Sequence, residues 1–349
     1  MEAVRQQEEA EGKRPRVEAA QPDDGSQLET STCCRRTWDR MPELRWLRRC
    51  KKFGKLGMKP EVLKVASAAC VSVRAGRWCP AADSFLRRCS DAGNADANFQ
   101  LGMIEFYCLR RRRQGWSRMK AAMRSGHAEV TFAAAVIRLN GTGSPAVDDR
   151  GPRAAARLFL RAASSGHIGA LRDLGFCVSN GLGVPPDPAA GRRLTIWANV
   201  QELRDRYPEP GPERDAALAH VGSAPGCLST GFGCFAAAPR RLEWAHPANR
   251  FLGEWFAARP PAPRLRLLCS LPTCGRPETR RLEFRRCTAC GVSRYCSRAR
   301  PVHWRMGHRA ECVPVHQWLL AAMANQAAAH VDGALAAAAA PGNVAGFPI

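Results

Sequence analysis

The feature that most constrains how this chain can fold is a group of cysteines and histidines between residues 269 and 312. Six cysteines lie there, with His308 four residues before the last of them, in the spacing Cys269-x4-Cys274, Cys287-x2-Cys290, Cys296, Cys312. A CxxC pair on a turn directs two thiolates toward one metal ion, and residues four apart share one face of a helix. Thiolates with an imidazole are typical ligands of closed, four-coordinate zinc sites. The spacing therefore predicts structural zinc in this stretch.

A cluster of disulfides is the alternative interpretation, since small secreted domains are often built on them. The N-terminus lacks the hydrophobic region of a signal peptide, and no apolar run reaches the roughly 18 residues of a membrane span. We therefore expect a soluble, intracellular protein, nuclear or cytoplasmic, in which zinc is favoured over disulfides. The other cysteines are scattered along the chain, and we interpret them as small buried hydrophobic residues.

The order of residues in this stretch resembles a MYND-type zinc finger. The resemblance rests on Cys287-Thr-Ala-Cys-Gly-Val-Ser-Arg-Tyr-Cys-Ser297 and on His303-Trp-Arg-Met-Gly-His-Arg-Ala-Glu-Cys312. Fingers of that family bind two zinc ions in a cross-brace, where the first and third ligand pairs share one ion and the second and fourth share the other. Members of the family bind peptides, often proline-rich ones, so the resemblance also implies such a partner.

The resemblance implies one complete zinc site and one incomplete site. The complete site comprises Cys287, Cys290, His308 and Cys312. The incomplete site comprises Cys269, Cys274 and Cys296. Its fourth position is Arg300, where the family has cysteine, and a guanidinium offers no lone pair to a metal.

Two other arrangements remain open. His303 lies three residues beyond Arg300 and could supply the missing nitrogen. Sequential pairing would instead make a complete site from the first four cysteines of the stretch, Cys269, Cys274, Cys287 and Cys290.

A repeated pattern in residues 83–199 predicts paired helices. Three segments align on a glycine, and these glycines, Gly93, Gly126 and Gly166, are 33 and 40 residues apart, a period typical of helical solenoids. Glycine there can adopt the left-handed conformation that ends a helix. Nine residues after each glycine comes a small residue, Gly102, Ala135 or Gly175, where a close helix crossing would exclude a larger side chain. These segments resemble Sel-one-like repeats, which are relatives of the tetratricopeptide repeats.

Two histidines and an arginine run accompany the repeats. His127 and His167 occupy equivalent places just after the aligned glycines, and no carboxylate or cysteine stands at a fixed offset from both. We interpret them as residues that start a helix rather than as catalytic groups. The run Arg110–Arg113 is expected to be an exposed loop between repeats, with phosphate binding as the alternative.

The fold class predicted for the whole chain is mostly α, a helical-repeat solenoid followed by a small cross-brace zinc finger, with disordered termini. The expected segments are a disordered N-terminus in 1–37, F-box remnant helices in 38–75, Sel-one-like repeats in 76–204, a linker in 205–263, the zinc finger in 264–316 and an alanine-rich tail in 317–349.

Three of these segments carry further expectations. Residues 38–75 resemble the closing part of an F-box, as in plant F-box proteins that end in a MYND finger, without the opening helices that contact the cullin-ligase adaptor. In the linker, an aromatic island that includes Trp244, Phe251 and Trp255 is expected to dock on the last repeat. In the N-terminus, Lys13–Arg16 is a candidate nuclear-import patch.

The formal net charge of +22 raises the question whether the chain binds nucleic acid or an acidic partner. Most of the basic residues are arginines spread along the chain, a pattern that fits a bias in composition as well as a binding face. The stretch from Arg264 to Cys312 is rich in arginine, yet it lacks the helix-reading pattern of base-specific fingers.

These observations favour a zinc-binding, non-enzymatic adaptor that binds protein partners through its solenoid and its finger. A substrate receptor of a cullin-type ubiquitin ligase is one alternative, and a basic nucleic-acid-associated finger protein is another. No group of residues in the sequence predicts a catalytic site.

Overall fold

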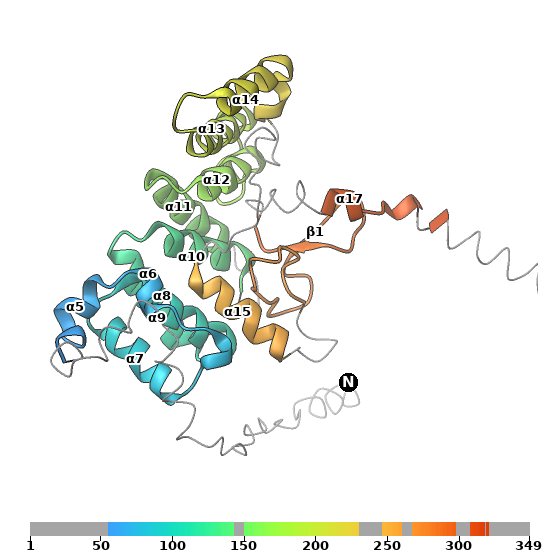
Figure 1. The fold of residues 1–349 in the computed structure, drawn as a ribbon. Helices are drawn as coiled ribbons and strands as arrows, with labels where there is room; N and C mark the ends of the chain where they lie inside the picture. The colour runs from blue at the N-terminus through green and yellow to red at the C-terminus, as the bar shows by residue number, and fades with distance from the viewer. Residues whose placement is uncertain are drawn as a thin grey trace, which may run out of the picture.

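The computed structural model describes residues 55–142, 150–229, 246–259, 267–297, 308–317 and 319–320, and it is mostly α-helical (Figure 1). The first part contains α5 (Pro60–Val65), α6 (Ala68–Val71), η2 (Ala75–Arg77), α7 (Pro80–Asp91), α8 (Ala95–Met103), a π-helical turn η3 (Ile104–Cys108), α9 (Arg112–Arg124) and α10 (Ala128–Asn140). The second part contains α11 (Arg150–Ser164), α12 (Ile168–Asn180), α13 (Pro188–Arg206), α14 (Pro212–Ser223), η4 (Pro225–Ser229) and α15 (Pro247–Ala258). The finger contributes β1 (Arg285–Arg286), β2 (Arg294–Tyr295) and α17 (Arg309–Glu311).

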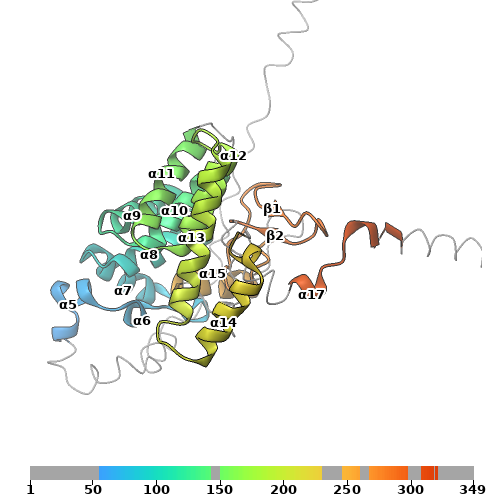
Figure 2. The same cartoon turned by 90° about the horizontal axis from the view of Figure 1, so that it is seen from above.

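Helices α7 to α13 stack as successive hairpins (Figures 1 and 2). We call α7, α9, α11 and α13 the A helices, and α8, α10 and α12 the B helices. The turn inside each hairpin contains one of the three aligned glycines, and Gly93, Gly126 and Gly166 have φ angles of +89°, +82° and +82°. The predicted solenoid and its register are therefore confirmed.

Small residues allow close crossings between each B helix and the next A helix. A Cβ atom on Gly102 would lie 3.0 Å from the carbonyl oxygen of Gly115, and one on Gly175 would lie 2.9 Å from that of Gly191. The first glycine of each pair was predicted from its spacing. The second was missed, although Gly115 and Gly191 occupy equivalent places near the starts of α9 and α13.

The segment expected to be a linker contains two helices, α14 and α15. The aromatic island does not dock on the last repeat, because α15 packs against α8, η2 and η3 at the other end of the solenoid (Figure 1). Phe251 and Leu252 of α15 are fully buried there. The prediction failed because it placed the segment beside its neighbour in sequence, whereas apolar residues of the first repeat provide the surface that α15 covers.

The finger packs on the B helices. One buried cluster combines Phe132 of α10 and Phe159 of α11 with Leu271, Cys274 and further residues of the finger. The finger and α15 therefore cover the B-helix side of the solenoid.

Several expectations concern residues outside the described part of the chain. These are the disordered N-terminus with Lys13–Arg16, the first half of the F-box-like segment, Trp244, and nearly all of the alanine-rich tail. Among the residues that are described, no helix has the length and apolar character that a membrane crossing requires.

Candidate metal centres

The first cysteine and histidine cluster is built on a tight turn between the two short strands. Cys287 and Cys290 flank this turn, and the Gly291 N–H donates to the carbonyl of Cys287 at 2.8 Å. Gly291 has a φ of +68°, a conformation that a side chain would disfavour. His308 and Cys312 approach from the two ends of α17, so that one ligand atom from each of the four residues lies within 4.8 Å of all the others.

The second cluster is built on a similar turn. Cys274 is followed by Gly275, whose φ is also +68°. Cys269, Cys274 and Cys296 bring their sulfur atoms within 4.8 Å of one another, and all three residues are buried. The structure thus brings together the two groups that cross-bracing pairs, and not the four cysteines that sequential pairing would join. Arg300 and His303 lie outside the described residues.

The distances within both clusters suit a tetrahedral zinc ion. Zinc–sulfur bonds of about 2.3 Å place two sulfur ligands about 3.8 Å apart. The Sγ atoms of Cys274 and Cys296 are 3.6 Å apart, and those of Cys287 and Cys312 are 3.9 Å apart. A disulfide requires about 2.05 Å between its sulfur atoms. The donor sets and their spacing fit zinc, with four ligands in one cluster and three in the other.

Neighbouring groups hold His308 in a form that can bind a metal. Its Nε2 atom lies 3.6 Å from the Cys290 sulfur, and its Nδ1 atom lies 3.0 Å from the Ser293 hydroxyl. Burial lowers the pKa of His308, which favours the neutral imidazole. A hydrogen bond to the second ring nitrogen fixes the orientation of a ligating histidine. Ser293 was not predicted from the sequence, because a serine within a turn has no distinctive spacing.

The thiols of the two clusters differ in environment. Burial raises the pKa of Cys269 well above that of a free cysteine. For Cys290, burial acts in the same direction, but hydrogen bonds from the N–H groups of Ser293 and Val292 and with the thiols of Cys287 and Cys312 together lower its pKa. Within the four-ligand cluster the thiols also differ from one another, because burial raises the pKa of Cys312 to about 12.

Polar contacts attach the three-cysteine cluster to the end of α10. The Asn140 side chain donates to the carbonyl of Cys296 at 2.7 Å, and the Arg280 guanidinium donates to the carbonyl of Asn140 at 2.5 Å. Thr142 donates to the buried carboxylate of Glu283. Sequence reasoning missed these residues, since Asn-Gly at the end of a helix also occurs without such contacts.

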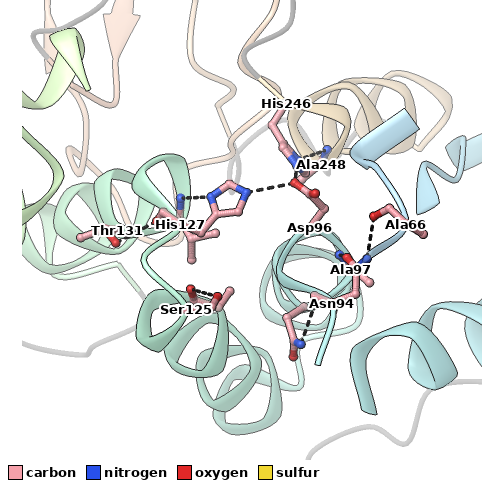
Figure 3. A network of polar contacts seen from close by, with 12 residues as sticks. Ala66, Asn94, Asp96, Ala97, Ser125, His127, Thr131, His246 and Ala248 are labelled. Atoms are coloured by element: carbon pink, nitrogen blue, oxygen red, sulfur yellow. Dashed lines mark hydrogen bonds and ion pairs between the residues drawn. The ribbon is translucent and has the colours of Figure 1, made fainter. Parts of the chain in front are cut away.

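A third cluster consists of Asp96, His127 and His246 (Figure 3). The Nε2 atoms of both histidines lie at 3.0 and 3.1 Å from one oxygen of Asp96. Hydrogen bonds from His127 and then His246 hold the pKa of this carboxyl well below its usual range. The Nδ1 atoms of His127 and His246 accept the backbone N–H groups of Val130 and Ala248. Each Nε2 therefore carries a proton and has no lone pair for a metal, so the cluster is a structural network.

The histidines of the repeats are helix caps, as predicted, and they also have acidic partners, which were not predicted. His127 begins α10 and His167 begins α12. The partners, Asp96 and Glu129, each stand two residues after the N-cap of the preceding B helix. The carboxylates thus occupy a constant place in the repeat, although their distance in sequence from the histidine varies.

An apolar groove opens between α11 and α13. Its volume is about 370 Å³, and its lining includes Leu160, Ile168, Leu171, Leu174, Leu194 and Trp197, with Gln201 and Asp205 toward one end. Leu160 and Trp197 are more than half exposed. A groove with apolar walls and few polar groups is typical of a binding site.

Comparisons with known proteins add three findings. The family of plant tetratrico peptide repeats matches residues 72–164. An F-box protein of Arabidopsis thaliana is 41% identical over 81% of this chain and 77% of its own length, and a second is 39% identical over 78% of each chain. A solved Sel1 repeat protein from Oxalobacter formigenes aligns with 39% of this chain and 95% of its own, at 18% identity and a TM-score of 0.29.

Proposed function

This chain belongs to the family of those two plant F-box proteins, and on that basis we propose that it is a non-enzymatic adaptor that binds protein partners. The observation that carries the proposal is the exposed apolar groove of the solenoid. Within the described part of the chain, α15 and the finger cover the B-helix side, and the A-helix side, where the groove opens, is the face left for a partner. Solenoids of this kind offer extended surfaces for protein ligands.

The adaptor includes two zinc sites of unequal strength. Cys287, Cys290, His308 and Cys312 would hold one ion tightly. Cys269, Cys274 and Cys296 would hold a second ion more weakly, because among the described residues they supply three of the four ligands of a tetrahedral site. Zinc would act structurally here, by joining the two ends of the finger. The finger would be of the MYND type and would offer a second surface, to which proline-rich peptides are the expected ligands.

The adaptor proposal is tested by separating the two binding surfaces. Partners would first be purified from native tissue with the full chain as bait. Binding of each purified partner would then be measured to the parent chain, to Trp197→Ser and to Cys287→Ser. An adaptor should bind directly and saturably, and each partner should be lost from one variant and kept by the other. The proposal is wrong if no partner binds again from purified components.

A second candidate is the substrate receptor of a cullin-type ubiquitin ligase, which the F-box names of the relatives favour. Binding of the purified cullin-ligase adaptor to the full chain would be measured by size-exclusion chromatography. A receptor should form a stable complex that Leu47→Glu, in the F-box-like segment, weakens and that Trp197→Ser leaves intact. Absence of a complex would leave the adaptor without a ligase role.

A further inference from the structure

Charge is distributed unevenly between the two helix layers of the solenoid. The charged residues of α9 and α11 are all basic: Arg112, Arg113, Arg118, Lys120 and Arg124 in α9, and Arg150, Arg153, Arg157 and Arg161 in α11. Those of the B helices have both signs: Asp96 in α8, Glu129 and Arg138 in α10, and Arg172 and Asp173 in α12. A bias in composition alone would enrich the A helices and the B helices in arginine alike. The excess of positive charge therefore belongs to α9 and α11 on the A-helix side, since α7 and α13 carry acidic residues as well.

Two basic residues on this side lie on the helices that form the walls of the groove. Arg157 lies three residues before Leu160 on α11, and Arg193 lies four residues before Trp197 on α13, so each shares a helix face with a groove residue. Helices α11 and α13 are separated by one further antiparallel helix and run in the same direction. The two arginines consequently stand at the same end of the groove.

These arginines are available to a partner. Arg157 and Arg193 are exposed, and among the described residues neither forms an ion pair with a carboxylate. Arg172 of α12 differs from them, since it is buried and pairs with Glu202 at 3.0 Å. An exposed guanidinium without an internal partner can make charge-assisted hydrogen bonds to a ligand carboxylate.

We propose that the groove binds an acidic polypeptide segment that carries a bulky apolar side chain. The apolar side chain lies between Leu160 and Trp197, and carboxylates next to it contact Arg157 and Arg193. This inference rests on the proposed adaptor function and names the chemistry of the partner.

The groove favours a polypeptide over a nucleic acid. Its floor is formed by Ile168, Leu171 and Leu174, which offer no hydrogen-bond donors from their side chains to a phosphate. Asp205 lines the end opposite Arg157 and Arg193 and would repel a phosphodiester chain that followed the groove. A large apolar side chain in a desolvated pocket, with charged groups at the rim, is the usual anchor of a protein ligand.

The test measures binding of the full, zinc-loaded chain to a fluorescent peptide in which glutamates flank a Leu-Phe pair. The double variant Arg157→Glu/Arg193→Glu should weaken binding at least about tenfold, because it replaces two charge-assisted contacts with repulsion. Trp197→Ser should weaken it to a similar degree through loss of the anchor contact. The control Lys59→Glu/Lys64→Glu makes the same change of net charge at exposed positions around α5 and should leave binding unchanged. Circular dichroism melts establish that each variant is folded.

Two further ligands complete the experiment. A peptide with glutamine in place of glutamate, and a short single-stranded oligodeoxynucleotide, should both bind at least about tenfold more weakly than the acidic peptide. Equal binding by parent and double-arginine variant, or by the glutamine peptide, would overturn the proposal. Binding of the oligonucleotide that depends on the arginines and not on Trp197 would replace it with a nucleic-acid surface. If native partners bind elsewhere and the peptide does not bind, the groove assignment fails while the adaptor function stands.

Discussion

The Nε2 atom of His167 lies 2.8 Å from a carboxylate oxygen of Glu129, which stands on the preceding B helix. The Nδ1 atom of the same ring accepts the N–H of Ala170 at 2.9 Å and so caps α12. The His167 side chain therefore caps the start of its own helix, α12, and bonds that helix to α10, the preceding B helix. His127 and Asp96 repeat the arrangement one hairpin earlier.

Removal of the shared carboxylate should loosen the start of the solenoid. Asp96→Ala deletes the acceptor of both His127 and His246, and each hydrogen bond to a charged group contributes about 1.5–3 kcal/mol. Denaturant unfolding at neutral pH should show a loss of this order or more. Asp91→Ala is the control, because that side chain is largely exposed and its contact with Arg118 is long, at 3.4 Å.

The loss of unfolding free energy caused by Asp96→Ala should depend on pH, in a direction set by the lowered pKa of Asp96. A carboxyl whose pKa is lower in the folded chain stabilises the fold above its unfolded pKa of about 3.9, and this contribution is lost as pH falls toward the folded value. The difference in unfolding free energy between parent and variant should be full at pH 6–7 and shrink below about pH 4. A difference that grows at acid pH would contradict the assigned hydrogen bonds.

Enlarging the glycines at the helix crossings should destabilise the repeats. Gly102→Leu and Gly175→Leu introduce Cβ atoms at 2.9 Å from their nearest neighbours, and overpacking of this kind costs about 1–3 kcal/mol. The thermal midpoint should fall for both variants. Gly222→Leu in α14 is the matched control, since nothing lies within 4 Å of the Cβ it would introduce. Midpoints that match the parent would mean that the crossings can open without cost.

Single ligand variants should separate the two metal sites. The parent chain is expected to hold one zinc ion tightly and a second weakly. Zinc retained after dialysis should be lost in Cys287→Ser and kept in Cys269→Ser, because the two cysteines belong to different clusters. Loss of the tight ion from Cys269→Ser would instead indicate sequential pairing. Two tight ions in the parent would indicate a fourth ligand for the second site, for which His303 is the candidate.

Zinc removal should also affect the repeats. Leu271 and Phe284 of the finger share a buried cluster with Phe132 and Phe159 of the solenoid. Loss of these contacts would lower the unfolding free energy of the repeats by about 2 kcal/mol or more. This change corresponds to a fall of roughly 4–8 °C in the thermal midpoint of a domain of this size. With excess chelator, the helical signal should persist at room temperature and melt earlier than in the loaded chain. A midpoint unchanged by chelator would show that the finger and the solenoid are energetically independent.

Local and periodic features of the fold could be predicted from the sequence. Gly93, Gly126 and Gly166 were found because a left-handed turn has few alternatives to glycine, and they fixed the register of the hairpins. The grouping of the cysteines came from resemblance to a known finger rather than from spacing, since spacing alone left two pairings open.

Contacts between distant segments could not be predicted in the same way. Asn140 and Cys296 are 156 residues apart, and neither has a neighbour in sequence that indicates the other. The sequence also left open whether the positive charge gathers on one side of the fold. The spread of arginines along the chain resembled a bias in composition until the hairpins placed alternate helices on opposite sides.

The contact between His246 and Asp96 also has a consequence for biosynthesis. The two residues are separated by 150 positions, and α15, which begins at Pro247, covers apolar side chains of the first repeat. At the usual ribosomal rate of about 5–20 residues per second, roughly 8–30 seconds pass between synthesis of the two. During that interval the first hairpins have emerged without the helix that covers them, and their apolar face is open to chaperones and to other nascent chains. The late arrival of α15 thus leaves apolar side chains of the first hairpins uncovered until most of the chain has been synthesised.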